Sequence, residues 1–154
     1  MRRAVNTRAG IGALLVIGVA FCGIGYLGLV APTALLVPLQ VDWGTFPNAA
    51  RNEFTATYGG MHAAMGLFFI VAAFVPSIRL GALLAAATFM SGLVVGRITA
   101  LVRDGLSGPM PLALVLVELM GVLITLGAVL KRHAPPAAPA SVAPSAPGAS
   151  TPPL

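Results

Sequence analysis

Charged side chains are scarce in this sequence. Only 8% of the 154 residues are Asp, Glu, Lys or Arg, whereas soluble domains carry about 25%. Hydrophobic residues make up 58% of the chain. A surface facing water cannot be built from this composition, so the sequence excludes an ordinary soluble domain and indicates an integral membrane protein.

The residue patterns of common catalytic and cofactor sites are also missing. Cys22 is the only cysteine, which excludes an intramolecular disulfide and a cysteine-based metal cluster within one chain. There is no paired-histidine metal motif, no glycine-rich phosphate loop with a lysine, and no nucleophile elbow. His62 and His133 fall in a predicted span and a predicted tail, so they are not expected to share a metal ion. We therefore expect a protein that is not an enzyme and has neither metal nor cofactor.

The formal net charge is +5, but the basic residues do not form a patch that fits nucleic acid. They occur singly or in short clusters beside apolar runs, where topology signals belong. The expected partners are therefore membrane lipids, together with a partner membrane subunit or a second copy of the chain. Nucleic acid is not an expected partner.

Four apolar segments are each long enough to cross the hydrocarbon core, which takes about 20 helical residues. They cover residues 10–30, 52–75, 80–102 and 111–130. The turn at Pro76 and Ser77 is short, which makes the second and third segments antiparallel neighbours. The prediction is an all-α fold, an integral membrane four-helix bundle of up-down-up-down topology within residues 1–133. A cleaved signal peptide is the rival interpretation of the first segment, but its apolar run is longer than a typical signal core.

The connections and the C-terminal end differ in composition from the four spans. Residues 42–48 indicate a loop in which Trp43 and Phe46 lie at the level of the lipid headgroups. Residues 134–154 are mainly Pro, Ala and Ser without a charge. Such a segment cannot bury enough apolar area to order itself, so we expect a disordered tail.

Orientation follows from the basic residues in the loops. Arg51 and Arg103 are the two basic residues on one side of the predicted spans, and six lie on the side of both termini. Because cytoplasmic loops carry an excess of Lys and Arg, we expect a multi-pass protein of the cell inner membrane with both termini in the cytoplasm. The six residues on that side are Arg2, Arg3, Arg8, Arg79, Lys131 and Arg132.

Five polar residues are candidates for a buried polar cluster or a ligand-binding site in the outward half. Arg97 and Glu118 fall well inside two spans, where an unpaired charge costs on the order of 3 kcal/mol or more. At 1.5 Å per residue both lie roughly 9–10 Å from the outer helix ends, which predicts an ion pair. Tyr58 and His62 share one helical stripe, with Tyr58 placed to cap the pair and Glu53 near the mouth. The candidate residues are Glu53, Tyr58, His62, Arg97 and Glu118.

Each candidate also has a purely structural interpretation. The ion pair between Arg97 and Glu118 can serve only to hold two helices in register. His62 alone in a span is more often a hydrogen-bonded packing residue than a ligand. Glu53 can be a helix-start residue, favoured by the positive end of the helix dipole.

Small residues at four-residue spacing mark two helix faces. Ala56, Gly60 and Ala64 form a stripe on the second segment that is expected to let another helix approach closely. Gly92 and Gly96 have the same spacing on the third segment. We interpret this pair as a packing face within the bundle rather than as a dimerisation signal.

Several short motifs occur in a fixed order along the chain: Asn52 and Glu53, residues 56–60 with Tyr58, Gly96 and Arg97, Asp104 and Gly105, and Glu118. This pattern resembles a bacterial four-helix membrane family catalogued as domain-of-unknown-function family forty-three forty-five. The resemblance covers roughly residues 10–130 and implies the fold but no activity. A looser similarity to DoxX-like four-helix membrane proteins implies a similar bundle and, by analogy only, an accessory redox role.

One hypothesis and three alternatives result, and the third alternative, a membrane enzyme, would need a nucleophile or a metal site that the sequence does not show. The leading hypothesis is a non-enzymatic inner-membrane protein that acts as an accessory or small-ligand-binding module through its outward half. The first alternative is a quinone- or redox-linked accessory subunit in which Tyr58, His62 and Arg97 contact a lipid-soluble headgroup. The second is a small transporter, although the cytoplasmic halves of the spans have almost no ionisable group for a continuous polar path.

Overall fold

The computed structural model describes residues 8–105 and 108–130, and their regular structure is entirely helical. Four helical runs are long and apolar enough to cross a membrane: α1 (Arg8–Val30), Asn48–Phe74, α5 (Arg79–Asp104) and α6 (Pro109–Leu130). The predicted all-α fold class is confirmed. The expected disordered tail, residues 134–154, lies outside the described residues.

The second long run is built from three consecutive pieces. α3 (Asn48–Phe54) continues into the π-helical segment η3 (Thr55–Met61), which continues into α4 (His62–Phe74). The run ends where Val75 turns to an extended conformation, because the following Pro76 disfavours helical geometry in the residue before it. A π-helical segment is rare and often lies at a functional site.

The connection between α1 and α3 consists of short helical turns. It contains α2 (Pro32–Leu36), the 3-10 turn η1 (Val37–Leu39) and the 3-10 turn η2 (Trp43–Thr45). Pro32 opens α2, where its missing N–H costs nothing. The Asp42 side chain caps η2 by accepting a hydrogen bond from the Gly44 N–H. The prolines therefore divide this segment into turns rather than leaving it irregular.

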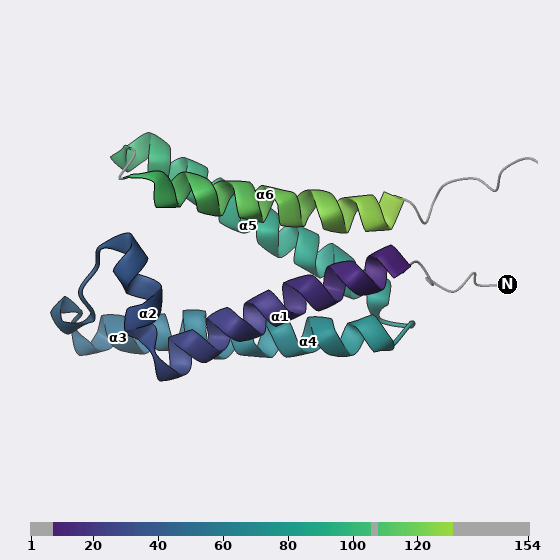
Figure 1. The fold of residues 1–154 in the computed structure, drawn as a ribbon, viewed down its shortest axis with the longest axis horizontal. Helices are drawn as coiled ribbons and strands as arrows, with labels where there is room; N and C mark the ends of the chain where they lie inside the picture. Colours follow the sequence, from purple (N-terminus) through teal and green to yellow (C-terminus); the bar gives the residue numbers. More distant parts are fainter. Residues whose placement is uncertain (1–7, 106–107, 131–154) are drawn as a thin grey trace, which may run out of the picture.

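The four long runs alternate in direction and form two closely packed pairs (Figure 1). α1 packs along α4, and α5 packs along α6. Figure 1 shows the two pairs close together near the α4–α5 turn and separated at the end that carries α2 and α3. The core at the junction contains Leu14, Phe69 and Leu83, all fully buried.

Glycines bring α1 into backbone contact with the second run. A Cβ atom on Gly28 would lie 2.6 Å from the backbone nitrogen of Gly59, and one on Gly66 would lie 2.5 Å from that of Cys22. A Cβ on Gly25 would collide with the backbone of Ala63. Close approach of this kind is how small residues join helices when the hydrophobic effect gives no net attraction between them.

The predicted small-residue stripes are wrong in detail. Ala56 and Ala64 are exposed and the space beside Gly60 is open, because the neighbouring row of Gly59, Ala63 and Gly66 makes the contact with α1. Two rows of small residues lie side by side in this sequence, and the position of the glycines on α1 decides which row is used. The space beside Gly92 and Gly96 is likewise open, so this pair is not a packing face in the described fold.

Arg79 has a structural role that the sequence did not indicate. Although it sits at the α4–α5 turn, it is 4% exposed, and its Nη2 donates a 2.7 Å hydrogen bond to the Ala73 carbonyl near the end of α4. A cation that donates to the last carbonyls of a helix stabilises that helix end. The end of the molecule at the α4–α5 turn is thus apolar in its core, and this arginine stabilises it.

Candidate functional site

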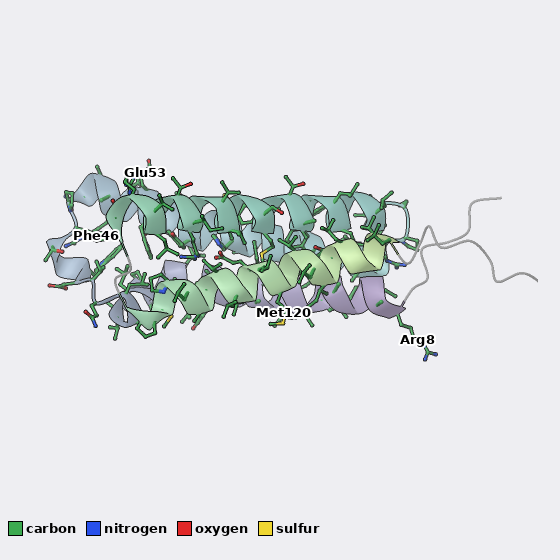
Figure 2. The ribbon with its side chains drawn as sticks, turned by 90° about the horizontal axis from the view of Figure 1, so that it is seen from above. Arg8, Phe46, Glu53 and Met120 are labelled. Atoms are coloured by element: carbon green, nitrogen blue, oxygen red, sulfur yellow. The ribbon has the colours of Figure 1, made fainter. Side chains whose placement is uncertain are left out.

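The ion pair predicted from helix depth is present. Arg97 Nε on α5 lies 2.7 Å from Glu118 Oε1 and 2.8 Å from Oε2 on α6. Glu118 is buried, with 6% exposure, whereas the Arg97 side chain keeps 30%. Met120, two residues after Glu118, lies on the outer face of α6 (Figure 2). The carboxylate therefore faces inward and draws its hydrogen bonds from one guanidinium nitrogen.

This geometry leaves most of the Arg97 guanidinium available. A guanidinium carries five N–H donors, and only the one on Nε is used by Glu118. Neither Nη1 nor Nη2 hydrogen-bonds to any residue within 8–105 and 108–130, and neither is completely buried. Glu118 thus holds the guanidinium through Nε, and the four donors on Nη1 and Nη2 have no partner in the part of the chain that the structure describes.

A cavity of about 190 Å³ lies beside Arg97. A larger cavity of about 370 Å³ lies between η1 and the start of α6, and Pro111 lines both cavities. Gln40, which lines the larger cavity, adopts a left-handed backbone conformation with φ 59°. The smaller cavity is lined by Arg97, Ala100, Leu101, Asp104, Gly105 and Pro111.

Tyr58 does not cap the ion pair. Its hydroxyl makes no hydrogen bond to Arg97 or Glu118, and its ring stacks on Phe54 at 4.6 Å and on His62 at 5.5 Å between centroids. The three rings are spaced four residues apart, so they align along one helix face. The aromatic stacking holds the Tyr58 ring on its own helical run.

His62 is a buried ring in an aromatic setting. It is 5% exposed, and its ring stacks between Phe21 at 5.1 Å and Tyr58 at 5.5 Å, with the edge of Phe89 at 6.0 Å. Its Nδ1 lies 2.7 Å from the Thr57 carbonyl oxygen in the π-helical segment. A carbonyl can only accept, so Nδ1 carries a proton and donates this hydrogen bond. This environment fits the packing interpretation of His62.

The stack extends outward as an aromatic column that sequence reasoning did not identify. Trp43 lies 5.5 Å and Phe46 6.2 Å from the Phe54 ring. The Arg51 guanidinium lies 5.6 Å from the Trp43 ring centroid and donates a 3.0 Å hydrogen bond to the Gly44 carbonyl. The loop aromatics are therefore packed on α3. The spacing of Phe54, Tyr58 and His62 was the signal that could have revealed the column.

The structure does not bring Glu53 into either group. Its side chain is exposed, forms no ion pair within the described residues, and lies at the loop end of the molecule, opposite Arg8 (Figure 2). The candidate residues thus separate into the Arg97–Glu118 pair, the Tyr58–His62 stack and an isolated Glu53. Within residues 8–105 and 108–130, no cluster of three His, Cys, Asp or Glu side chains could hold a metal ion.

A known protein family covers the part of the chain that contains these residues. The family model described as Domain of unknown function (DUF4345) matches residues 12–129. The chain belongs to this family. No curated protein and no solved structure matches it. The match contains the ion pair, both cavities and the aromatic column, so the candidate site lies entirely within the DUF4345 domain.

Two of the described residues offer hydrogen-bonding groups to a ligand. Arg97 has N–H donors and lines a cavity, and an oxygen acceptor that reached these donors would receive charge-assisted hydrogen bonds. His62 offers its Nε2 atom within the aromatic column. The first of these groups borders a cavity large enough to admit part of a ligand, and it is the stronger candidate site.

Proposed function

We propose that this protein is a non-enzymatic, multi-pass protein of the bacterial inner membrane that binds a small lipid-soluble ligand in its outward half. The observation that carries the proposal is the Arg97 guanidinium, which Glu118 holds through Nε, on a residue that lines a cavity of about 190 Å³. Donors without acceptors are costly inside a span, where water is scarce. A ligand with an oxygen acceptor would satisfy them.

In the proposed topology both termini are cytoplasmic and the cavity opens toward the periplasm. The excess of basic residues beside the termini and at the Arg79 turn supports this orientation. Arg8 and the aromatic loop lie at opposite ends of the molecule (Figure 2), so the loop and the cavity near Arg97 would be periplasmic. In this position the protein would act as an accessory module, alone, with a partner subunit or as a homo-oligomer.

Co-purification tests the proposal. The wild type, the double variant Arg97→Met/Glu118→Leu and the control Arg8→Met are isolated in mild detergent, extracted with organic solvent and analysed by mass spectrometry. Arg8 is a suitable control because its side chain is exposed and lies at the end of the molecule opposite Glu53 (Figure 2). We expect a stoichiometric compound from the wild type and the control that is absent from the double variant. Equal retention by all three would refute a site at Arg97.

A quinone-linked accessory role is a second candidate, favoured by the aromatic column. Tyr58 is 42% exposed and stacks on the buried His62 ring, which makes a flat surface for an aromatic headgroup. If this candidate is correct, quinone in the extract of wild-type protein will be depleted by Tyr58→Leu and retained by Tyr26→Leu, a change at another exposed tyrosine on α1. Quinone that is retained equally by both variants would argue against it.

A further inference from the structure

We infer that the ligand at Arg97 is electrically neutral and presents a carbonyl-type oxygen, rather than a carboxylate or a phosphate. This inference rests on the proposed function and specifies the ligand class of the same site. The ligand's oxygen would accept hydrogen bonds from Nη1 and Nη2, and its apolar part would occupy the cavity beside them.

The charge balance of the ion pair is the first argument. Both oxygens of Glu118 accept from Arg97 Nε, so the positive charge is already compensated by a carboxylate that is 6% exposed. A second anion on the same guanidinium would give the site a net negative charge. It would also lie within a few ångströms of the first carboxylate, where a low dielectric makes repulsion strong.

The second argument is that the described residues lining the cavity include no cation other than Arg97. Asp104 is one of its lining residues, and Arg103 is engaged by both oxygens of that carboxylate at 2.7 and 2.6 Å. An anion entering the cavity would therefore meet Asp104 without an unpaired positive charge to offset it. Three of the other lining residues, Ala100, Leu101 and Pro111, present apolar side chains to a ligand.

A neutral carbonyl can accept hydrogen bonds from the same donors without changing the net charge of the site. It would receive charge-assisted hydrogen bonds from Nη1 or Nη2 and leave the Glu118 contact intact. Two lipid-soluble sources have this group: the ester carbonyl of a membrane lipid and the ring carbonyl of a quinone. Both share the chemistry that the site recognises, and the experiment separates them.

Matched probes test the inference on the full-length protein in detergent. Methyl decanoate and decanoate have the same chain and differ in that the second is ionised at pH 8. Each is titrated at equal mole fractions in the detergent while the melting temperature is recorded, because a ligand that binds the folded state raises it. We expect methyl decanoate to reach half-saturation at about tenfold lower mole fraction, the change equivalent to ~1.4 kcal/mol.

The variant Glu118→Gln should reverse the order in which the two probes stabilise the protein. A cavity that binds only through apolar contacts would not show this reversal. The amide oxygen can still accept from Arg97 Nε, but the guanidinium becomes an uncompensated cation. We therefore expect decanoate to stabilise this variant more than methyl decanoate does. If the variant cannot be purified, the comparison of the wild type with Arg97→Met/Glu118→Leu still tests the inference, since neither probe should bind the double variant at this site.

The outcomes separate the inference from the proposed function. If decanoate stabilises the wild type more than methyl decanoate does, and the double variant does not show this effect, the inference of a neutral ligand is wrong. The proposed binding site at Arg97 is then still supported. No stabilisation by any probe, or equal stabilisation of the double variant, overturns both. A decyl-substituted benzoquinone forms the third arm: stabilisation by it alone assigns the carbonyl to a quinone, and stabilisation by the ester alone assigns it to a lipid.

Discussion

Breaking the Arg97–Glu118 pair from one side is expected to cost more than removing both partners. In Arg97→Met, the Glu118 carboxylate keeps its buried position but loses its donor, and a lone buried charge costs about 3–5 kcal/mol. In Glu118→Leu, the guanidinium has 30% side-chain exposure and can turn its N–H groups outward. The second loss should therefore be smaller, about 1–3 kcal/mol.

The double variant Arg97→Met/Glu118→Leu removes both charges. Replacing a buried ion pair with apolar side chains of similar volume is often close to neutral, so we expect a loss of about 0–1 kcal/mol. Independent effects would sum to about 4–8 kcal/mol from the two single losses above. The expected coupling is thus ~3 kcal/mol or more, well above the error of an additive pair.

Equilibrium unfolding in mixed micelles, followed by circular dichroism, measures the four free energies of the cycle. Arg103 and Asp104 provide the matched control pair, with side-chain exposures of 73% and 55%. The corresponding cycle there should give a coupling of about 0–1 kcal/mol, as for exposed ion pairs. Additive losses at Arg97 and Glu118 would refute the argument that the two residues depend on each other, and with it the oriented donors of the proposed site.

Three further predictions test the topology, the tail and the helix contacts. Reporter fusions at Asp42 and Asp104 should read periplasmic, and a cytoplasmic signal at either position would contradict the proposed orientation. Deletion from Pro135 onward should leave the melting temperature unchanged, because a Pro, Ala and Ser segment has no apolar face to dock; a fall of several degrees would be contrary evidence. Gly28→Ala should destabilise the protein by about 1–3 kcal/mol through overpacking, whereas Gly23→Ala, where the space is open, should be neutral or stabilising in the same unfolding assay. Equal effects of the two glycine changes would be inconsistent with the contact between α1 and η3.

The parts of this structure that sequence predicted well are those governed by one-dimensional rules. Span number and approximate position follow from apolar length alone, and the four long helices are where hydropathy places them. The Arg97–Glu118 pair also follows from counting residues, because helix rise converts position into depth and two isolated charges at one depth need each other.

The features that were missed depend on azimuth around a helix rather than depth along it. Tyr58 lies at a suitable depth to reach the ion pair, but its direction is set by stacking on Phe54 and His62. The π-helical segment rotates the residues before it about the helix axis relative to those after it. The composition of residues 55–61 does not predict a π-helix. The choice of Gly59 over Gly60 as the contact likewise depends on which face α1 presents.

The position of the candidate site can be traced to the unequal ways in which the helix pairs are joined. α1 and α4 meet through backbone contact at Gly66 and Gly25, whereas Arg97 on α5 and Glu118 on α6 form an ion pair. The two pairs share an apolar core around Phe69 near the α4–α5 turn and part toward the opposite end (Figure 1). The ion pair therefore ties α5 to α6 without tying one helix pair to the other. Arg97 therefore lines a cavity instead of lying inside the packed core, which is the arrangement that a ligand requires.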